Sequence, residues 1–169
     1  MKRSSIMIGM TVLFVVASCE SSTNVGATTT WTATLNGANE RPNPVTNTSG
    51  TGTFTATINA NNVMTYSLTF SGLTTNSNNA HIHGPGTTSQ AVGAILDFNA
   101  LPASATATTA LVLGATSGTA AGTVNLNQAI TATVSGDSLK HLFELGLAYV
   151  NVHTTQNTGG EIRGQITKQ

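Results

Sequence analysis

Three histidines, His81, His83 and His153, form a candidate metal-binding set in this sequence. His81 and His83 lie two residues apart in a segment with a strand-like pattern, so both side chains leave the same face while Ile82 points into the core. His153 lies near the end of the chain and could supply a third nitrogen if its strand neighbours the one that carries His81. Three neutral imidazoles suit Cu(II) or Zn(II), whereas Ca²⁺ prefers oxygen ligands. The spacing therefore permits a copper or zinc site.

Three further polar residues could support these histidines. Glu161 could orient an imidazole as an outer acceptor or act as a fourth ligand, with Arg163 as its charge partner and Asn151 nearby on the same face. The alternative is a structural network in which the histidines hydrogen-bond one another, Asn151, Glu161 and the backbone. Because few other polar groups here can bridge strands, the residues alone favour this network, and the Glu161–Arg163 pair is likewise expected to be structural. We leave out His141, which lies among helical positions.

The segments that must position these residues have the periodicity of β-strands. Apolar residues alternate with Thr or Ser over residues 31–35, 53–58 and 64–70. The last two segments are joined across Asn61-Asn62, which predicts a tight hairpin because Asn tolerates positive φ. The pattern predicts further strands over residues 80–83, 92–98, 118–126, 129–134, 148–153 and 161–166, and one short helix near residues 137–145 that ends at Gly146.

The last two predicted strands suggest a hairpin with one apolar face. If His153 lies opposite Glu161, then Val152 meets Ile162 and Val150 meets Gly164. The opposite face then carries polar side chains, namely Tyr149, Asn151, His153, Glu161, Arg163 and Gln165. About nine short strands with one helix predict an all-β fold, an antiparallel two-sheet β-sandwich of Greek-key, immunoglobulin-like or superoxide-dismutase-like type, over residues 29–169.

The first residues have the pattern of an export signal. Lys2 and Arg3 precede an apolar run over residues 6–16, which is too short to span a bilayer as a helix. The run ends in Val-Ala-Ser-Cys, which resembles the lipobox of bacterial lipoproteins, in which the cysteine is acylated after cleavage just before it. We therefore expect a signal peptide over residues 1–18 and lipidation at Cys19, the alternative being an ordinary signal peptide with a chance cysteine. Cys19 is the only cysteine, so no disulfide can form within the chain.

The residues after Cys19 bear on localisation. Residues 19–28 are small and polar, as in a flexible tether. Glu20 stands where aspartate favours retention in the inner membrane of enteric bacteria, so we expect an exported protein anchored in the outer membrane through its acyl chains, facing the periplasm or the cell surface. Without Lys2 and Arg3, four basic residues face six acidic ones, so no basic patch for nucleic acid exists.

Four motifs in order carry a resemblance to a known family. They read Leu-Asn-Gly-Ala-Asn-Glu-Arg-Pro at 35–42, Ala-His-Ile-His-Gly-Pro at 80–85, Tyr-Val-Asn-Val-His-Thr at 149–154 and Gly-Glu-Ile-Arg-Gly-Gln-Ile at 160–166. Together they resemble the CHRD domain, which is repeated in the vertebrate secreted protein chordin and occurs singly in many bacterial exported proteins. The resemblance covers about residues 30–167, departs from the commonest pattern at residues 86–90, and implies an extracytoplasmic β-rich domain with no established catalytic activity.

Two functions follow as expectations. The first is a membrane-anchored binding or scaffolding module for a protein or glycan ligand, which is not an enzyme. The alternative is a copper- or zinc-binding periplasmic or surface protein that uses His81, His83 and His153. A superoxide dismutase is disfavoured because four histidines cannot fill its two-metal site and its disulfide cannot form. A serine hydrolase is disfavoured because the chain has no Gly-x-Ser-x-Gly motif.

Overall fold

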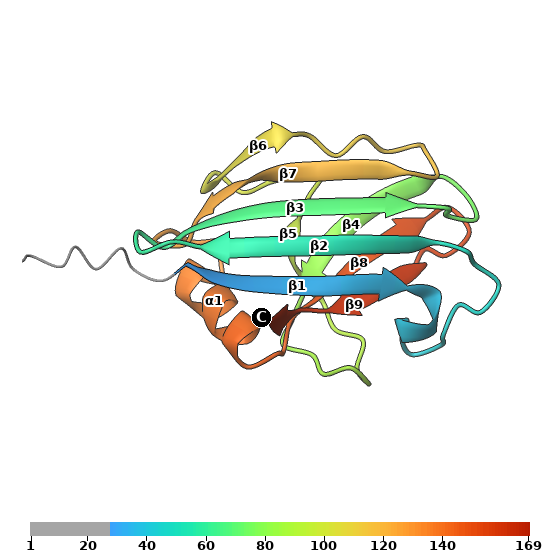
Figure 1. The fold of residues 1–169 in the computed structure, drawn as a ribbon, viewed down its shortest axis with the longest axis horizontal. Coiled ribbons are helices and arrows are strands. Elements are labelled where there is room, and N and C mark those ends of the chain that lie inside the picture. Colours follow the sequence, from blue (N-terminus) through green and yellow to red (C-terminus); the bar gives the residue numbers. More distant parts are fainter. Residues whose placement is uncertain (1–27) are drawn as a thin grey trace, which may run out of the picture.

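An antiparallel β-sheet makes up most of the chain in this computed structural model (Figure 1). The structure describes residues 28–169, so the predicted signal peptide (1–18), Cys19 and the tether up to residue 27 lie outside the described residues. The strands are β1 (Thr29–Asn36), β2 (Thr51–Ile58), β3 (Val63–Ser71), β4 (Ser77–His83), β5 (Ala94–Asp97), β6 (Ala105–Thr109), β7 (Gly118–Asn125), β8 (Tyr149–Thr154), β9 (Ile162–Gln165) and β10 (Thr167–Lys168). A 3₁₀ turn, η1 (Gly37–Asn39), and one helix, α1 (Gly136–Glu144), complete the fold.

The strands form two layers that belong to one continuous sheet. Their order is β5-β4-β8-β9-β1-β2-β3-β7-β6, with β10 also paired to β1. In Figure 1 the half made of β1, β2, β3, β7 and β6 lies in front of the half made of β9, β8, β4 and β5, whose strands cross behind it at an angle. The sheet therefore curls into a half-barrel, and the predicted all-β antiparallel fold is confirmed.

Strict alternation of side chains explains the core. In β2 and β3 every second residue is buried, and the residues between them are mainly exposed threonines and serines. The buried residues of both halves meet in one hydrophobic cluster. Helix α1 closes one end of it, since the Phe143 ring packs edge-on against Trp31 at 6.0 Å and against Phe54 at 6.5 Å between ring centroids.

Helix α1 begins and ends where the sequence predicts. The Ser135 hydroxyl accepts the backbone N–H of Ser138 at 3.0 Å and caps the first turn. At the other end Gly146 has φ +65°, and the Leu147 N–H reaches the Leu142 carbonyl at 2.8 Å, which is a glycine-dependent C-terminal cap. Among residues 28–169, no helix is long and apolar enough to cross a membrane.

Most predicted strands are confirmed, and the exceptions have local causes. The β2–β3 hairpin turns at Asn62, which has φ +56°. The strand predicted over residues 129–134 is wrong, because the Thr131 hydroxyl accepts the N–H groups of Thr133 and Val134 and bends the chain. Strand β6 is not predicted because it lies at the edge of the sheet with nearly all its residues exposed, so it lacks an apolar alternation.

Ile82 anchors β4 to the core, and its truncation tests how firmly that strand is held. The side chain is fully buried, so Ile82→Ala should lower the free energy of unfolding by about 2–5 kcal/mol in urea titrations. Val112→Ala is the control, because Val112 is 68 % exposed and its truncation should cost within about 0.5 kcal/mol. Equal losses in the two variants would contradict this packing.

Candidate metal centre

Two neighbouring strands bring the three predicted histidines to one face. Strands β4 and β8 are antiparallel partners, with Asn79 opposite His153, His81 opposite Asn151 and His83 opposite Tyr149. Because side chains alternate, the three imidazoles lie on the face away from the core, while Ile82 and Val152 are buried on the other face. The predicted proximity of His153 to His81 and His83 is therefore confirmed.

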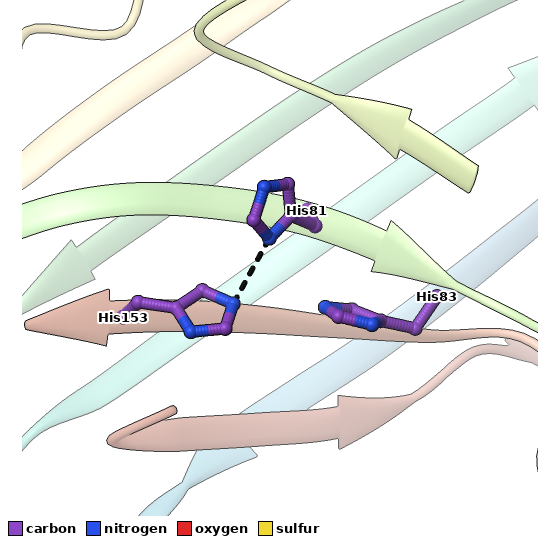
Figure 2. A group of neighbouring side chains, drawn as sticks. All are labelled: His81, His83 and His153. Atoms are coloured by element: carbon purple, nitrogen blue, oxygen red, sulfur yellow. Dashed lines mark hydrogen bonds between the residues drawn. The ribbon is translucent and has the colours of Figure 1, made fainter. Parts of the chain in front are cut away.

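The three imidazoles converge on a small volume. One nitrogen from each ring can be chosen so that all three lie within 4.8 Å of one another. The closest pair is His81 Nδ1 and His153 Nε2, which are 2.9 Å apart. Figure 2 shows the His83 ring directing a nitrogen toward the other two rings. The arrangement can offer three nitrogen ligands to one ion.

The other nitrogen of each ring faces an acceptor. His83 Nδ1 lies 2.8 Å from the Val92 carbonyl, and His153 Nδ1 lies 2.9 Å from the Thr158 carbonyl. His81 Nε2 lies 3.7 Å from the Asp97 carboxylate. A ring nitrogen that faces an acceptor carries the proton in the neutral imidazole, so its opposite nitrogen keeps a lone pair. The lone pairs of His83 Nε2 and His153 Nε2 therefore point inward, toward His81 Nδ1.

The inner nitrogens of His81 and His153 are 2.9 Å apart, so either a proton, as in a hydrogen bond from His81 Nδ1, or a metal ion lies between them. His83 Nε2 is buried, and it has no hydrogen-bond partner among residues 28–169. A buried polar atom without a partner is costly and uncommon in folded proteins. A proton shared between His81 and His153 leaves this third nitrogen unsatisfied.

Burial keeps the three rings neutral. It is the main cause that lowers the pKa of His83 to about 4, and it also lowers the pKa of His81 and of His153. The Asp97 carboxylate opposes this effect at His81 by favouring the charged ring. Imidazoles bind metal in the deprotonated form, so all three rings are ready ligands at neutral pH.

An aromatic stack holds the His83 ring in place. The rings of His83 and Tyr149 are parallel, with centroids 4.8 Å apart. The Arg163 guanidinium lies 3.5 Å from the centroid of the Tyr149 ring, at cation–π distance. The Tyr149 hydroxyl donates to the Val92 carbonyl at 3.2 Å, the same oxygen that faces His83. Strand β8 and the loop before β5 therefore restrict the same imidazole.

The predicted outer residues Asn151 and Arg163 hydrogen-bond elsewhere. The Asn151 amide donates to the Glu40 carboxylate at 2.5 Å, and its oxygen is buried without a partner among the described residues. Arg163 donates to the carbonyls of Gln90 at 2.7 Å and Thr87 at 2.8 Å. These bonds tie the loop after β4 to β9, and none of them reaches a histidine.

Glu161 is also held away from the histidines. Its carboxylate is fully buried and accepts four hydrogen bonds, from the hydroxyls of Thr48 and Thr154, the N–H of Thr74 and the amide of Asn157. Within residues 28–169 it forms no ion pair with Arg163. Burial acts to raise the pKa of Glu161, but the hydrogen bonds outweigh it and bring the pKa to about 2.

Sequence reasoning does not identify the acceptors behind the imidazoles. Two of them are backbone carbonyls, of Val92 and Thr158, whose direction no residue type reveals. Asp97 did carry a signal, because it is the only charged residue between Arg41 and Asp137. A lone carboxylate in a predicted strand could have been matched to a histidine on the neighbouring strand.

Removal of the buried charge of Glu161 tests its structural role. Its pKa lies below the unfolded value of 4.5, so its stabilising contribution is complete above about pH 4.5 and is lost as the pH falls toward 2. Glu161→Gln should lower the free energy of unfolding at pH 7 by on the order of 3 kcal/mol and flatten its decline in acid. Glu144→Gln, an exposed change on α1, is the control in the same denaturant titrations. Unchanged stability of Glu161→Gln at pH 7 would contradict this role.

Comparison with known proteins identifies one family, whose model covers nearly all of the sheet. The family model of the CHRD domain matches residues 31–166, from the first buried aromatic of β1 to the last buried residue after β9. No curated protein matches the chain. The match contains all four motifs that carry the resemblance, and it includes His81, His83 and His153. The protein therefore belongs to the CHRD domain family.

Proposed function

We propose that this CHRD-domain protein binds one Cu(II) or Zn(II) ion through His81 Nδ1, His83 Nε2 and His153 Nε2. The observation that carries the proposal is the buried lone pair of His83 Nε2, which has no hydrogen-bond partner among residues 28–169 and faces the other two rings (Figure 2). A network of hydrogen bonds alone leaves this atom unsatisfied, whereas an ion would use it.

The donor set supports a borderline transition metal. Imidazole nitrogens suit copper and zinc, and the convergent atoms include no carboxylate oxygen that would favour calcium. Each imidazole has an acceptor behind it, at Val92, Thr158 or Asp97, as metal-bound histidines commonly have. Three nitrogens leave a coordination position for water or for another ligand in a four-coordinate ion.

Family membership supports the broader description of a binding module. A scaffolding function toward a protein or glycan ligand fits that description equally well, but no contact geometry within residues 28–169 selects such a ligand. The histidine geometry selects a ligand by its chemistry, so metal binding is the function that we put forward.

Metal titration of the full chain tests this function. The protein carries no polyhistidine tag and is first treated with a chelator to remove bound metal. Wild type should bind one Zn(II) or Cu(II) ion per chain in competition with a chromogenic chelator. His83→Ala should weaken binding by more than about a hundredfold, beyond the 10–100-fold typical for loss of an outer partner. At a metal concentration of about 100 times Kd, wild type should gain roughly 2.7 kcal/mol of stability.

Two further variants sharpen the metal titration. His141→Ala removes an exposed histidine of α1 and should leave affinity unchanged. Asp97→Asn keeps all three ligands but removes the carboxylate behind His81, and it should weaken binding by about 10–100-fold. The proposal fails if wild type binds either metal no more tightly than the His81→Ala/His83→Ala double variant does.

We further propose that the protein works outside the cytoplasm, anchored to the outer membrane through acyl chains on Cys19. The support is the sequence pattern that ends at Cys19. Mass spectrometry of the mature protein from its native cells should find an N-terminal Cys19 that carries acyl groups, and Cys19→Ala should remove them. An unmodified mature chain that starts elsewhere would overturn the anchor.

A further inference from the structure

A small recess lies beside β9, separate from the three histidines. Its volume is about 90 Å³, and Asn39, Arg41, Thr88, Arg163 and Gln165 line it. One water needs roughly 10–15 Å³ of such space, so the recess has room for several waters or for one small polyatomic ion. These side chains come from η1 and the loop after it, from the loop after β4, and from β9.

The recess is rich in hydrogen-bond donors. Arg163 is 1 % exposed; its Nη1 donates to the Gln90 carbonyl and its Nη2 donates to the Thr87 carbonyl and the Gln165 side-chain oxygen, so Nε–H and one Nη1–H of its five N–H groups are left over. Arg41 uses only Nη1, which donates to the carbonyls of Ala38 and Glu40. Among residues 28–169, Arg41 Nε and Nη2 have no hydrogen-bond partner. Two guanidiniums therefore have unused donors at one recess that no carboxylate lines.

The charges around the recess favour an anion. Burial lowers the pKa of Arg163, Tyr149 and Glu40 oppose that effect, and the neighbouring charge of Arg41 adds to the lowering. Glu40 is the nearby anion, but its two carboxylate oxygens already accept the Arg41 backbone N–H at 3.0 Å and the Asn151 amide. Glu40 interacts with both guanidiniums and offsets one of their two positive charges, so one positive charge is left for a bound anion.

We infer that Arg41 and Arg163 form a binding site for a small oxyanion, a carboxylate or a phosphate group. Planar guanidiniums match the oxygen pairs of both groups, and the Asn39 amide and the Thr88 hydroxyl can supply further donors. The ligand is either a free ion or an anionic group of a larger molecule that reaches the surface at Thr88. This site does not depend on metal binding by the histidines.

Titration of the full chain with sodium phosphate and, separately, with sodium acetate tests the site and distinguishes its two chemistries. The readout is the NMR signals of the arginine Nε–H groups, with sodium chloride at equal ionic strength as the reference. We expect saturable shifts of the Arg41 and Arg163 signals with at least one of the two anions. Arg41→Gln should weaken that binding by about 10–100-fold, as for the loss of a charge-assisted hydrogen bond.

Two other variants separate the site from general charge effects. Lys168→Gln removes an equal charge from the exposed strand β10 and should leave anion binding unchanged. Thr88→Val removes a donor from an exposed loop position that carries little fold stability, and it should weaken binding severalfold. The inference is overturned if neither anion gives saturable shifts, or if Arg41→Gln and Lys168→Gln weaken binding equally.

Discussion

Strand β8 pairs with β4 on one side and with β9 on the other, and its register fixes which side chains enter the core of the rear half. This register sends Val150 and Val152 into the core and Tyr149, Asn151 and His153 to the opposite face. A slip of one residue would exchange the two faces, because side chains alternate along a strand. The hydrophobic core of the rear half and the histidine cluster are therefore set by the same hydrogen bonds.

Buried charges then attach the loops to this rear half. Glu161 takes hydrogen bonds from Thr48 and Thr74, which lie just before β2 and after β3. Arg163 binds the carbonyls of Thr87 and Gln90 in the loop that leads to Val92. A buried charge is tolerated when it is hydrogen-bonded, as the carboxylate of Glu161 is by four donors and the guanidinium of Arg163 is by two carbonyls. In a chain with little charge, these two residues hold distant segments against one sheet face.

The loop that Arg163 holds also determines the chemistry of His83. Its Val92 carbonyl receives the Nδ1 proton, which leaves the Nε2 lone pair facing His81 and His153. Tyr149 connects the two, since its ring lies against His83 and its hydroxyl binds Val92. The histidine cluster is thus a product of loop placement as much as of strand spacing. The oxyanion recess uses the same loop through Thr88 and the same arginine.

Local periodicity was enough to predict much of this architecture. The alternation in β2 and β3, the Asn62 turn and the cap of α1 are short-range features, and each was predicted near its observed position. The hairpin of β8 and β9 was predicted in its observed register, which keeps Val150, Val152 and Ile162 on one face, as a slip of one residue would not. The prediction over residues 129–134 was wrong because side-chain hydrogen bonds from Thr131 override the apolar alternation there.

The class of fold, the family and the three histidines of one sheet face are therefore predictable, because they depend on residue type and spacing along the chain. The partners of the polar residues are known only from the folded chain. In the fold, Asp97 and two backbone carbonyls lie behind the imidazoles. The Glu161 carboxylate accepts hydrogen bonds from threonine hydroxyls and none from a histidine among the described residues. Hydrogen bonds between residues far apart in the chain depend on how the loops return to the sheet, and no local pattern encodes that path.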